Sequence, residues 1–161
     1  MIKNNSFPEM AIQQIWLEQD FDQVTLKTIC GQQVKIEFAG WYNSASGPDF
    51  REARLKIGKQ YFLGAVEIHV NSSGWYSHHH EGNPDYNNVV LHVVLYHNGQ
   101  RKIKRQDGQI VPELELAPLL SKEPSTSETE ANIHLKKLSE LPGRCGIAAL
   151  ERGTETLKKI L

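Results

Sequence analysis

Asp49, Glu67 and His69 are the residues whose types and spacing are best suited to chemistry. Glu67 and His69 are two residues apart in an otherwise apolar run over 61–70, so on a strand both side chains point to one face. Burying a carboxylate and an imidazole is costly unless they are paired or bind a metal. Asp49 starts the preceding predicted strand, and carboxylates on two neighbouring strands suit Mg²⁺ or Mn²⁺. Partners within the fold or a bound metal must therefore hold Glu67 and His69.

Other interpretations of the same three residues stay open. They form a buried hydrogen-bonded network that only fixes strand register, or Asp49 caps a turn through its carboxylate. Alternatively, His69 binds a metal directly, which shifts the preference towards Mn²⁺ or Zn²⁺. His69 is poorly suited to act only as a permanent positive charge, because histidine has an ordinary pKa of about 6.5 and is less fully protonated than a lysine would be.

The register of the hairpin that joins the two strands decides whether Asp49 reaches this site. With a three-residue turn over 58–60, Asp49 lies opposite His69. With a two-residue turn, in which Ile57 pairs with Gln60, Asp49 points to the opposite face, because a slip of one residue turns a whole face over. The sequence favours neither register.

Histidines outside this pair are candidates for a supporting role. Residues 78–80 are three consecutive histidines, and adjacent positions of a helix or strand cannot all face one ion. We therefore expect one of them, His78 or His80, to reach the site while the other two stay exposed. His92 lies on a buried predicted strand and is either a hydrogen-bonded core residue or a partner of the metal-site residues across the sheet.

Three further residues complete the candidates. Glu18, near the end of the first predicted helix, is either solvated or delivers a carboxylate to the site. Tyr86 is expected to be a packing residue, and Asn43 lies in the loop that leads to the candidate site.

The elements that must position these residues mix helices and strands. An amphipathic helix is predicted over 7–20 and a loop over 40–48, and residues 74–80 fit either a short helix or a structured loop. Alternation and β-branched runs predict strands, of which the last two are edge strands, over 24–30, 34–38, 49–57, 61–70, 89–96, 101–105 and 110–116. We expect an α+β domain, in the broad sense an α/β domain, with a mixed central sheet flanked by helices.

The composition changes after residue 120 of the 161. Residues 1–120 form the predicted domain, 121–132 are a polar linker rich in Ser, Thr, Glu and Pro, and 133–161 are a helical tail. The helical pattern has no stop signal at the last residue, so we expect the tail to be incomplete. The remainder of a longer chain, or a second copy of this one, is a possible partner.

Composition limits the classes of function. The formal net charge is −1, so no global field attracts nucleic acid or a membrane. Cys30 and Cys145 have no CxxC spacing and indicate neither a zinc site nor a disulfide framework, which fits a reducing compartment. No apolar run reaches membrane-spanning length, and residues 1–5 lack the core of a signal peptide. We expect a cytoplasmic protein without a membrane partner.

Several motifs together resemble a family of bacterial proteins catalogued as a domain of unknown function. They are Gly47-Pro48-Asp49-Phe50, Val66-Glu67-Ile68-His69, the segment with Trp75 and His78, Tyr86, and Val90-Leu91-His92-Val93-Val94. The resemblance covers about residues 7 to 120 and implies that this chain corresponds to an N-terminal portion of longer members.

Pro48-Asp49, followed after 18 residues by Glu67-x-His69, is also similar to the PD-(D/E)XK nuclease signature, with histidine in place of lysine. The similarity implies a restriction-endonuclease-like core with Mg²⁺ or Mn²⁺ as cofactor. It also implies that Asp49, Glu67 and the backbone carbonyl of Ile68 bind the ion, while His69, in the place of the lysine, stabilises phosphoryl charge or acts as a general base.

The function that these patterns predict is a metal-dependent phosphodiesterase acting on nucleic acid, with Asp49, Glu67 and His69 at its centre. One alternative is a binding or structural module of the same fold that has lost catalysis, as the missing lysine suggests. Another is a metal-binding regulatory domain that uses His69, one of the histidines at 78–80, and His92.

Overall fold

The computed structural model describes residues 8–120. The predicted strands over 34–38 and 89–96 are confirmed at their predicted bounds, and the central strand is slightly longer than predicted. In chain order, the elements are α1 (Glu9–Glu18), β1 (Val34–Phe38), β2 (Trp41–Tyr42), β3 (Phe50–Ile57), β4 (Gln60–Asn71), α2 (Gly74–Ser77), the 3₁₀ helices η1 (His80–Gly82) and η2 (Pro84–Tyr86), β5 (Val89–Tyr96), β6 (Glu113–Glu115) and the 3₁₀ helix η3 (Ala117–Leu119).

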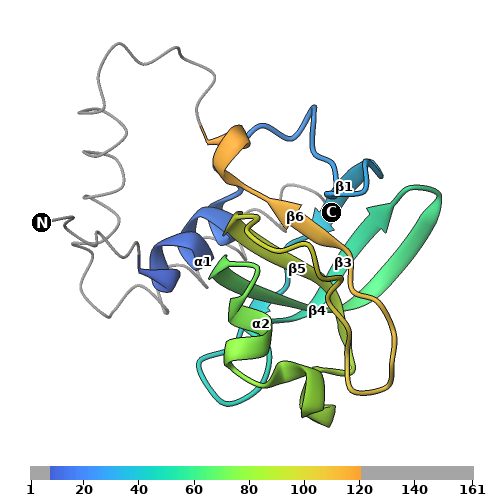
Figure 1. The fold of residues 1–161 in the computed structure, drawn as a ribbon. Helices are drawn as coiled ribbons and strands as arrows, with labels where there is room; N and C mark the ends of the chain where they lie inside the picture. Colours follow the sequence, from blue (N-terminus) through green and yellow to red (C-terminus); the bar gives the residue numbers. More distant parts are fainter. Residues whose placement is uncertain (1–7, 121–161) are drawn as a thin grey trace, which may run out of the picture.

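The strands form one curled mixed sheet in the order β1-β3-β4-β5-β6, and β2 adds to β3 (Figure 1). β1, β3 and β4 are antiparallel neighbours, whereas β4, β5 and β6 run parallel. The parallel step from β4 to β5 needs a crossover, which α2, η1 and η2 supply. The predicted mixed sheet in an α+β domain is therefore confirmed.

Apolar side chains cover both faces of the sheet. On one face, Trp16 and its neighbours in α1 pack against Phe50, Val66 and Leu91 in the larger core. On the other face, Trp75 of α2 lies in a smaller cluster with residues of β4, β5 and the β5–β6 connection. Because β4 lies between these layers, polar side chains on its second face are buried although they do not enter the larger core.

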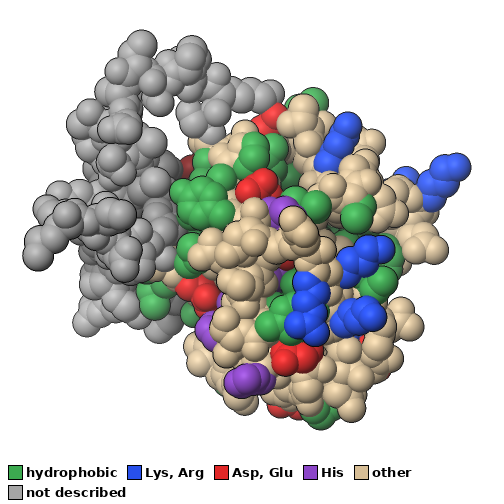
Figure 2. All heavy atoms as spheres, in the orientation of Figure 1, with side chains coloured by type: hydrophobic (Ala, Val, Ile, Leu, Met, Phe, Trp, Pro, Cys, Tyr) green, Lys and Arg blue, Asp and Glu red, His purple; other side chains and the backbone are tan. Residues whose placement is uncertain are grey.

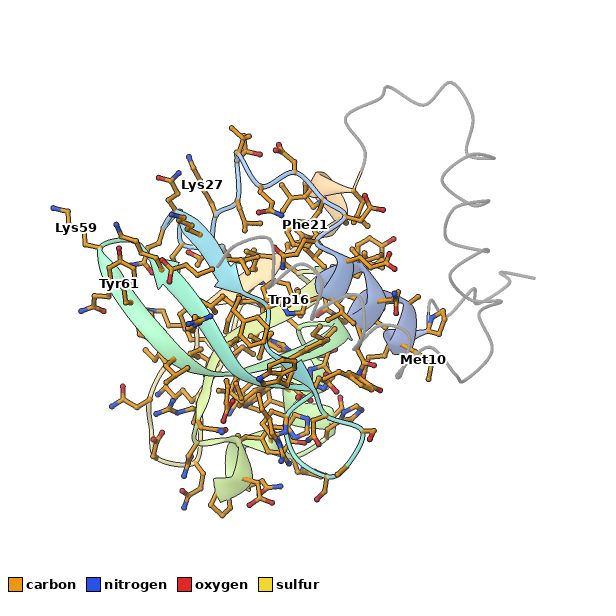
Figure 3. All side chains as sticks on the ribbon, turned by 180° about the vertical axis from the view of Figure 1, so that it is seen from behind. Met10, Trp16, Phe21, Lys27, Lys59 and Tyr61 are labelled. Atoms are coloured by element: carbon orange, nitrogen blue, oxygen red, sulfur yellow. The ribbon has the colours of Figure 1, made fainter. Side chains whose placement is uncertain are left out.

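β4 is covered along only part of its length. Its residues 65–69 are buried, but Tyr61 and Leu63 near its start are exposed. Figure 3 shows Tyr61 and Lys59 projecting from the tip of the β3–β4 hairpin, whereas Trp16 of α1 points toward the sheet. An apolar run such as 61–70 predicts a strand that is covered on both faces. This prediction holds for residues 65–69 but is wrong for the first half of β4, because the hairpin extends beyond the layers that cover the sheet.

The β3–β4 hairpin has the two-residue turn. Ile57 pairs with Gln60, the register that by itself carries Asp49 away from the face of Glu67. Asp49 nevertheless faces Glu67, whose Oε2 accepts a hydrogen bond from the Asp49 N–H. A feature between the turn and Asp49 must therefore reverse the faces.

That feature is a bulge in β3. The pairing with β4 shifts between Phe50 and Ala53, and Glu52 within the shift has a left-handed φ of 59°. Phe50 and Ala53 are both buried in the larger core although they are three residues apart, which regular alternation does not allow. Regular alternation over 49–57 predicts that Asp49 shares a face with Ala53. This prediction is wrong, because the extra residue reverses the faces and Asp49 returns to the side of Glu67.

Three predicted segments differ from the structure. Residues 24–30 contain only an isolated bridge at Lys27 in place of a strand, and the predicted basic strand over 101–105 contains only a bridge at Lys104. The predicted loop over 40–48 contains the short strand β2, which pairs with the start of β3. In all three segments, strand formation depends on whether a neighbouring segment is available for pairing, and local alternation or turn composition alone does not determine it. The predicted linker and helical tail lie outside the described residues.

Candidate functional site

Three imidazole nitrogens and one carboxylate oxygen converge on the second face of β4. The ligand atoms of His69, His78 and His80 all lie within 4.8 Å of one another. His69 Nε2 lies 3.1 Å from His78 Nδ1. Glu67 Oε1 lies 3.1 Å from His80 Nε2 and 3.7 Å from His69 Nε2. These four residues are called the histidine cluster below.

Two of the three consecutive histidines belong to this cluster. His78 follows the last turn of α2 and His80 begins η1, while His79 between them has a left-handed φ of 59°. The side chain of His79 is 87% exposed. The prediction that two of the three stay exposed is confirmed for His78 and His79. The prediction that only one reaches the site is wrong, because the left-handed residue reverses the chain and directs both of its neighbours to the same side.

Close packing fixes the rings of the cluster. A Cβ at Gly74, the first residue of α2, would lie only 2.6 Å from the ring of His69, so the helix start rests directly on this imidazole. Tyr86 stacks on His80 with ring centroids 3.8 Å apart, and Trp75 meets the rings of His80 and His92 edge-on. Tyr86 is thus a packing residue, as predicted, and its particular role is to orient a histidine.

A chain of hydrogen bonds orients His69 from behind. His69 Nδ1 lies 2.8 Å from His92 Nε2, and His92 Nδ1 lies 2.9 Å from Glu113 Oε2. An ionised carboxylate only accepts, so His92 donates from Nδ1 to Glu113 and accepts from His69 at Nε2. His69 therefore presents the bare lone pair of Nε2 to the cluster. A carboxylate that orients a histidine in this way is the usual outer shell of a metal ligand.

The buried imidazoles are neutral. Burial lowers the pKa of His69 to about 2, with the neighbouring histidines acting in the same direction, and it also lowers the pKa of His80 and of His92. The short contacts of His69 and His80 with Glu67 are therefore not ion pairs. Within residues 8–120, the buried Nε2 of His80 has no hydrogen-bond partner, which is costly for an interior nitrogen unless a ligand satisfies it.

Asp49 and Glu67 form a coupled acidic pair. The Asp49 N–H donates to Glu67 Oε2 at 3.0 Å, and the Ile68 N–H donates to Asp49 Oδ2 at 2.9 Å. Gln13 of α1 donates to the other oxygen, Asp49 Oδ1. Burial first, and then the repulsion between its carboxylate and Glu67, raises the pKa of Asp49 to about 8; burial likewise raises the pKa of Glu67 to about 8. Both Asp49 oxygens are occupied, so Glu67 Oε1 is the carboxylate atom of the pair that faces the histidines.

The remaining predicted residues lie outside the cluster. Asn43 donates to the backbone carbonyls of Ser46 and Pro48 and so shapes the loop that leads to Asp49. Glu18 accepts from Gln14 at the far end of α1 and is not the residue that this helix sends to the site.

Sequence reasoning missed three residues around the cluster. Gln13 and Glu9, four residues apart on one face of α1, approach the site. Burial raises the pKa of Glu9, and the nearby His78 and His80 act in the opposite direction. Glu113 belongs to β6, the far edge strand, and only the strand order places it beside His92. The Glu9/Gln13 spacing was visible in the sequence, whereas no sequence signal points to Glu113.

The cluster has the dimensions of a transition-metal site. Atoms bound at about 2.1 Å to a tetrahedral Zn²⁺ ion lie about 3.4 Å from one another. The separation of 3.1 Å between His69 Nε2 and His78 Nδ1 is close to that value, and the ligand atoms of all three histidines lie within 4.8 Å of one another. Neutral imidazoles suit Zn²⁺ and similar ions, whereas Mg²⁺ prefers oxygen ligands. Of the residues described, His69, His78 and His80 could hold such an ion, with Glu67 beside it.

The fold and the site together define an α+β domain whose mixed sheet carries a histidine–carboxylate cluster on its central strand. The chain belongs to the family DUF2851, described as a protein of unknown function, whose model matches residues 9–144. The predicted resemblance to a domain of unknown function is thereby confirmed. No curated protein and no solved structure matches the chain. Within residues 8–120, no helix is long and apolar enough to cross a membrane.

Proposed function

We propose that this domain is a transition-metal-dependent phosphodiesterase whose ion, Zn²⁺ in the first place, is held by His69, His78 and His80. The observation that carries the proposal is the convergence of three imidazole nitrogens within 4.8 Å. Two of these rings are buried and held neutral, so their lone pairs are available to a metal at physiological pH. Three protein ligands with one position left open is the usual arrangement of catalytic zinc.

Glu67 is the general base in this proposal. Its Oε1 lies 3.1 Å from His80 Nε2, beside the open position, and a pKa raised to about 8 makes its ionised carboxylate a stronger proton acceptor than that of an ordinary glutamate. Asp49 is a positioning residue, because its backbone N–H holds the other oxygen of Glu67. A bound ion would polarise a phosphoryl oxygen and lower the pKa of water.

Access to solvent and a nearby cation support a phosphodiester substrate. His78 is an exposed member of the cluster, so the site is open on that side. Arg51 follows Asp49 by two residues, is exposed, and donates to the Ser46 carbonyl in the loop that borders the site. An arginine in this place suits a phosphate of a nucleic acid strand. Nucleic acid is therefore the proposed substrate class, with histidine ligands in place of the Asp49/Glu67 magnesium site that the sequence pattern indicates.

Two adjacent substitutions test the metal site. His78→Ala removes an exposed ligand, and His79→Ala removes its equally exposed neighbour, which points away from the cluster. We expect His78→Ala to weaken Zn²⁺ binding about 10- to 100-fold in a chelator competition assay, while His79→Ala binds like the wild type. Equal affinities of the two variants would refute the ligand assignment.

Activity is then tested on the zinc-loaded chain. The assay uses bis(p-nitrophenyl) phosphate together with single- and double-stranded DNA. We expect Glu67→Gln to keep most of the Zn²⁺ affinity and lose hydrolysis about 100-fold or more, as removal of a general base does. If Glu67→Gln instead loses Zn²⁺ binding, Glu67 is a fourth ligand of the ion. No position would then be open for a substrate, which would argue against catalysis.

A second candidate is a metal-stabilised module without catalysis. The hydrogen bonds that occupy both Asp49 oxygens and Glu67 Oε2 favour it, because they leave a largely closed carboxylate network. Zn²⁺ binding that raises the melting temperature, with no hydrolysis of any of the three substrates, would support this function over the first.

A further inference from the structure

A pocket lies at the β6 edge of the sheet, and none of the four residues of the histidine cluster lines it. It has a volume of about 460 Å³ and is lined by three stretches of chain around residues 28–32, 97–103 and 110–113. This volume is within the range of pockets that enclose small organic ligands. The lining includes the apolar residues Ile29 and Ile110, which are 43% and 53% exposed, whereas Ile103 and Val111 in the lining are buried. The pocket therefore offers an apolar surface that water reaches.

Two basic residues in the lining give the pocket its charge. Arg101 and Lys102 are exposed, and neither forms an ion pair with any residue of the described range 8–120. Arg105, three residues further on, instead pairs with Asp107. The guanidinium of Arg101 lies 4.2 Å from the centre of the Tyr76 ring, which holds it in place. Figure 2 shows Lys and Arg side chains gathered on the face that carries the β5–β6 connection.

The carboxylate in the lining does not cancel this charge. Glu113 is 8% exposed, and both of its oxygens are already engaged, Oε2 by His92 and Oε1 by Ser72 and His97. Burial opposes its ionisation, but these hydrogen bonds lower the pKa of Glu113, so it stays ionised. Its negative charge is compensated by hydrogen bonds from Ser72, His92 and His97. A ligand in the pocket meets an apolar wall and two cations without carboxylate partners.

We propose that this pocket binds a small carboxylate with a hydrocarbon body. The hydrocarbon part packs against Ile29 and Ile110, and the carboxylate lies at Arg101 and Lys102. Charge-assisted hydrogen bonds from these two residues select an anion, and the apolar wall selects a body of several carbon atoms. The pocket shares no residue with the histidine cluster, although Glu113 of its lining orients His69 through His92.

Nuclear magnetic resonance of the metal-free, ¹⁵N-labelled full chain tests the proposal with octanoate, butyrate and octanol. Octanoate is expected to shift amide signals around residues 28–32, 99–103 and 110–113. Butyrate lacks most of the apolar contact and octanol lacks the charge, so each is expected to bind about tenfold more weakly or worse.

A matched pair of double variants tests the role of the charge. Arg101→Ala/Lys102→Ala removes the two cations of the pocket. Arg54→Ala/Lys56→Ala removes one arginine and one lysine of β3, each of which also lies over an aromatic ring. The first double variant is expected to lose octanoate affinity about tenfold or more, while the second binds like the wild type. Octanol binding as tight as octanoate, unchanged affinity in the first variant, or no octanoate-induced shifts would overturn the proposal, and none of these results bears on the metal centre.

Discussion

His69 and His92 share a hydrogen bond of 2.8 Å between Nδ1 and Nε2, and both rings are almost completely buried. This bond joins the histidine cluster on β4 to Glu113 on β6, two strands away. It fixes which nitrogen of His69 carries the proton, so an edge strand controls the lone pair that His69 presents to the other histidines of the cluster.

The first prediction concerns Glu113→Gln. The amide of glutamine can donate to His92 Nδ1, which would reverse the direction of donation along the chain and place a proton on His69 Nε2. A protonated nitrogen cannot bind a metal, so we expect Zn²⁺ affinity to fall about 10- to 100-fold. Chelator competition measures the change. Glu115→Gln is the control, because Glu115 accepts a hydrogen bond from the His97 backbone and takes no part in the hydrogen bonds that link Glu113, His92 and His69. Equal losses of Zn²⁺ affinity in both variants would contradict the role of Glu113.

Gly74→Ala tests the packing of α2 on His69. The added Cβ would lie 2.6 Å from Cγ and Cδ2 of this ring, so the helix or the imidazole must move. We expect a loss of about 1–3 kcal/mol in the free energy of unfolding, as overpacking causes, together with weaker Zn²⁺ binding. Denaturant unfolding measures the first effect. Gly82→Ala, in η1, has no atom within 4 Å of the new Cβ and should change neither quantity.

Metal addition and removal should change thermal stability. An ion that binds only the folded chain stabilises it by about 4 kcal/mol when its free concentration is about a thousand times Kd. We expect Zn²⁺ to raise the melting temperature and EDTA to reverse the increase, with a much smaller response in His78→Ala. If neither Zn²⁺ nor EDTA changes the melting temperature of the wild type, the histidine cluster does not hold a metal.

The stability of the metal-free protein should fall as pH rises from 7 to 8.5. The pKa values of Asp49 and Glu67 are raised to about 8, so the folded pair retains a proton that the unfolded chain has already released. Stability that these groups contribute at low pH is therefore lost as pH passes through 8. We expect a decrease of about 1 kcal/mol in wild type and a smaller one in Glu67→Gln, because the substitution removes half of the pair. Denaturant titrations in EDTA at both pH values measure it, and identical slopes would show that the pair does not share a proton.

The lowered pKa values of the buried histidines make the stability of the protein rise with pH, and they do so at lower pH than the effect of Asp49 and Glu67. His69, His80 and His92 stay neutral in the folded chain but take up protons below about pH 6.5 when it unfolds. Their contribution to stability is present above that value and is lost on acidification. The two effects therefore occupy different pH windows, and Glu67→Gln should leave the acid side largely unchanged.

The sequence by itself determined the central strands β4 and β5 and the shared face of Glu67 and His69. A β-branched apolar run suffices to define β5, and a period of two places residues 67 and 69 on one side wherever β4 lies. The presence of buried polar residues in that run also indicated that they need partners. These features depend on local geometry, which the order of residues contains.

The tertiary structure decided which partners they have. The bulge at Glu52 returned Asp49 to the face of Glu67, against the register of the turn. The left-handed His79 directed both of its neighbours to the cluster, and the strand order placed Glu113 behind His92. Each depends on contacts between segments far apart in the chain, where a single shifted residue reverses a face, and local pattern carries no information about such shifts.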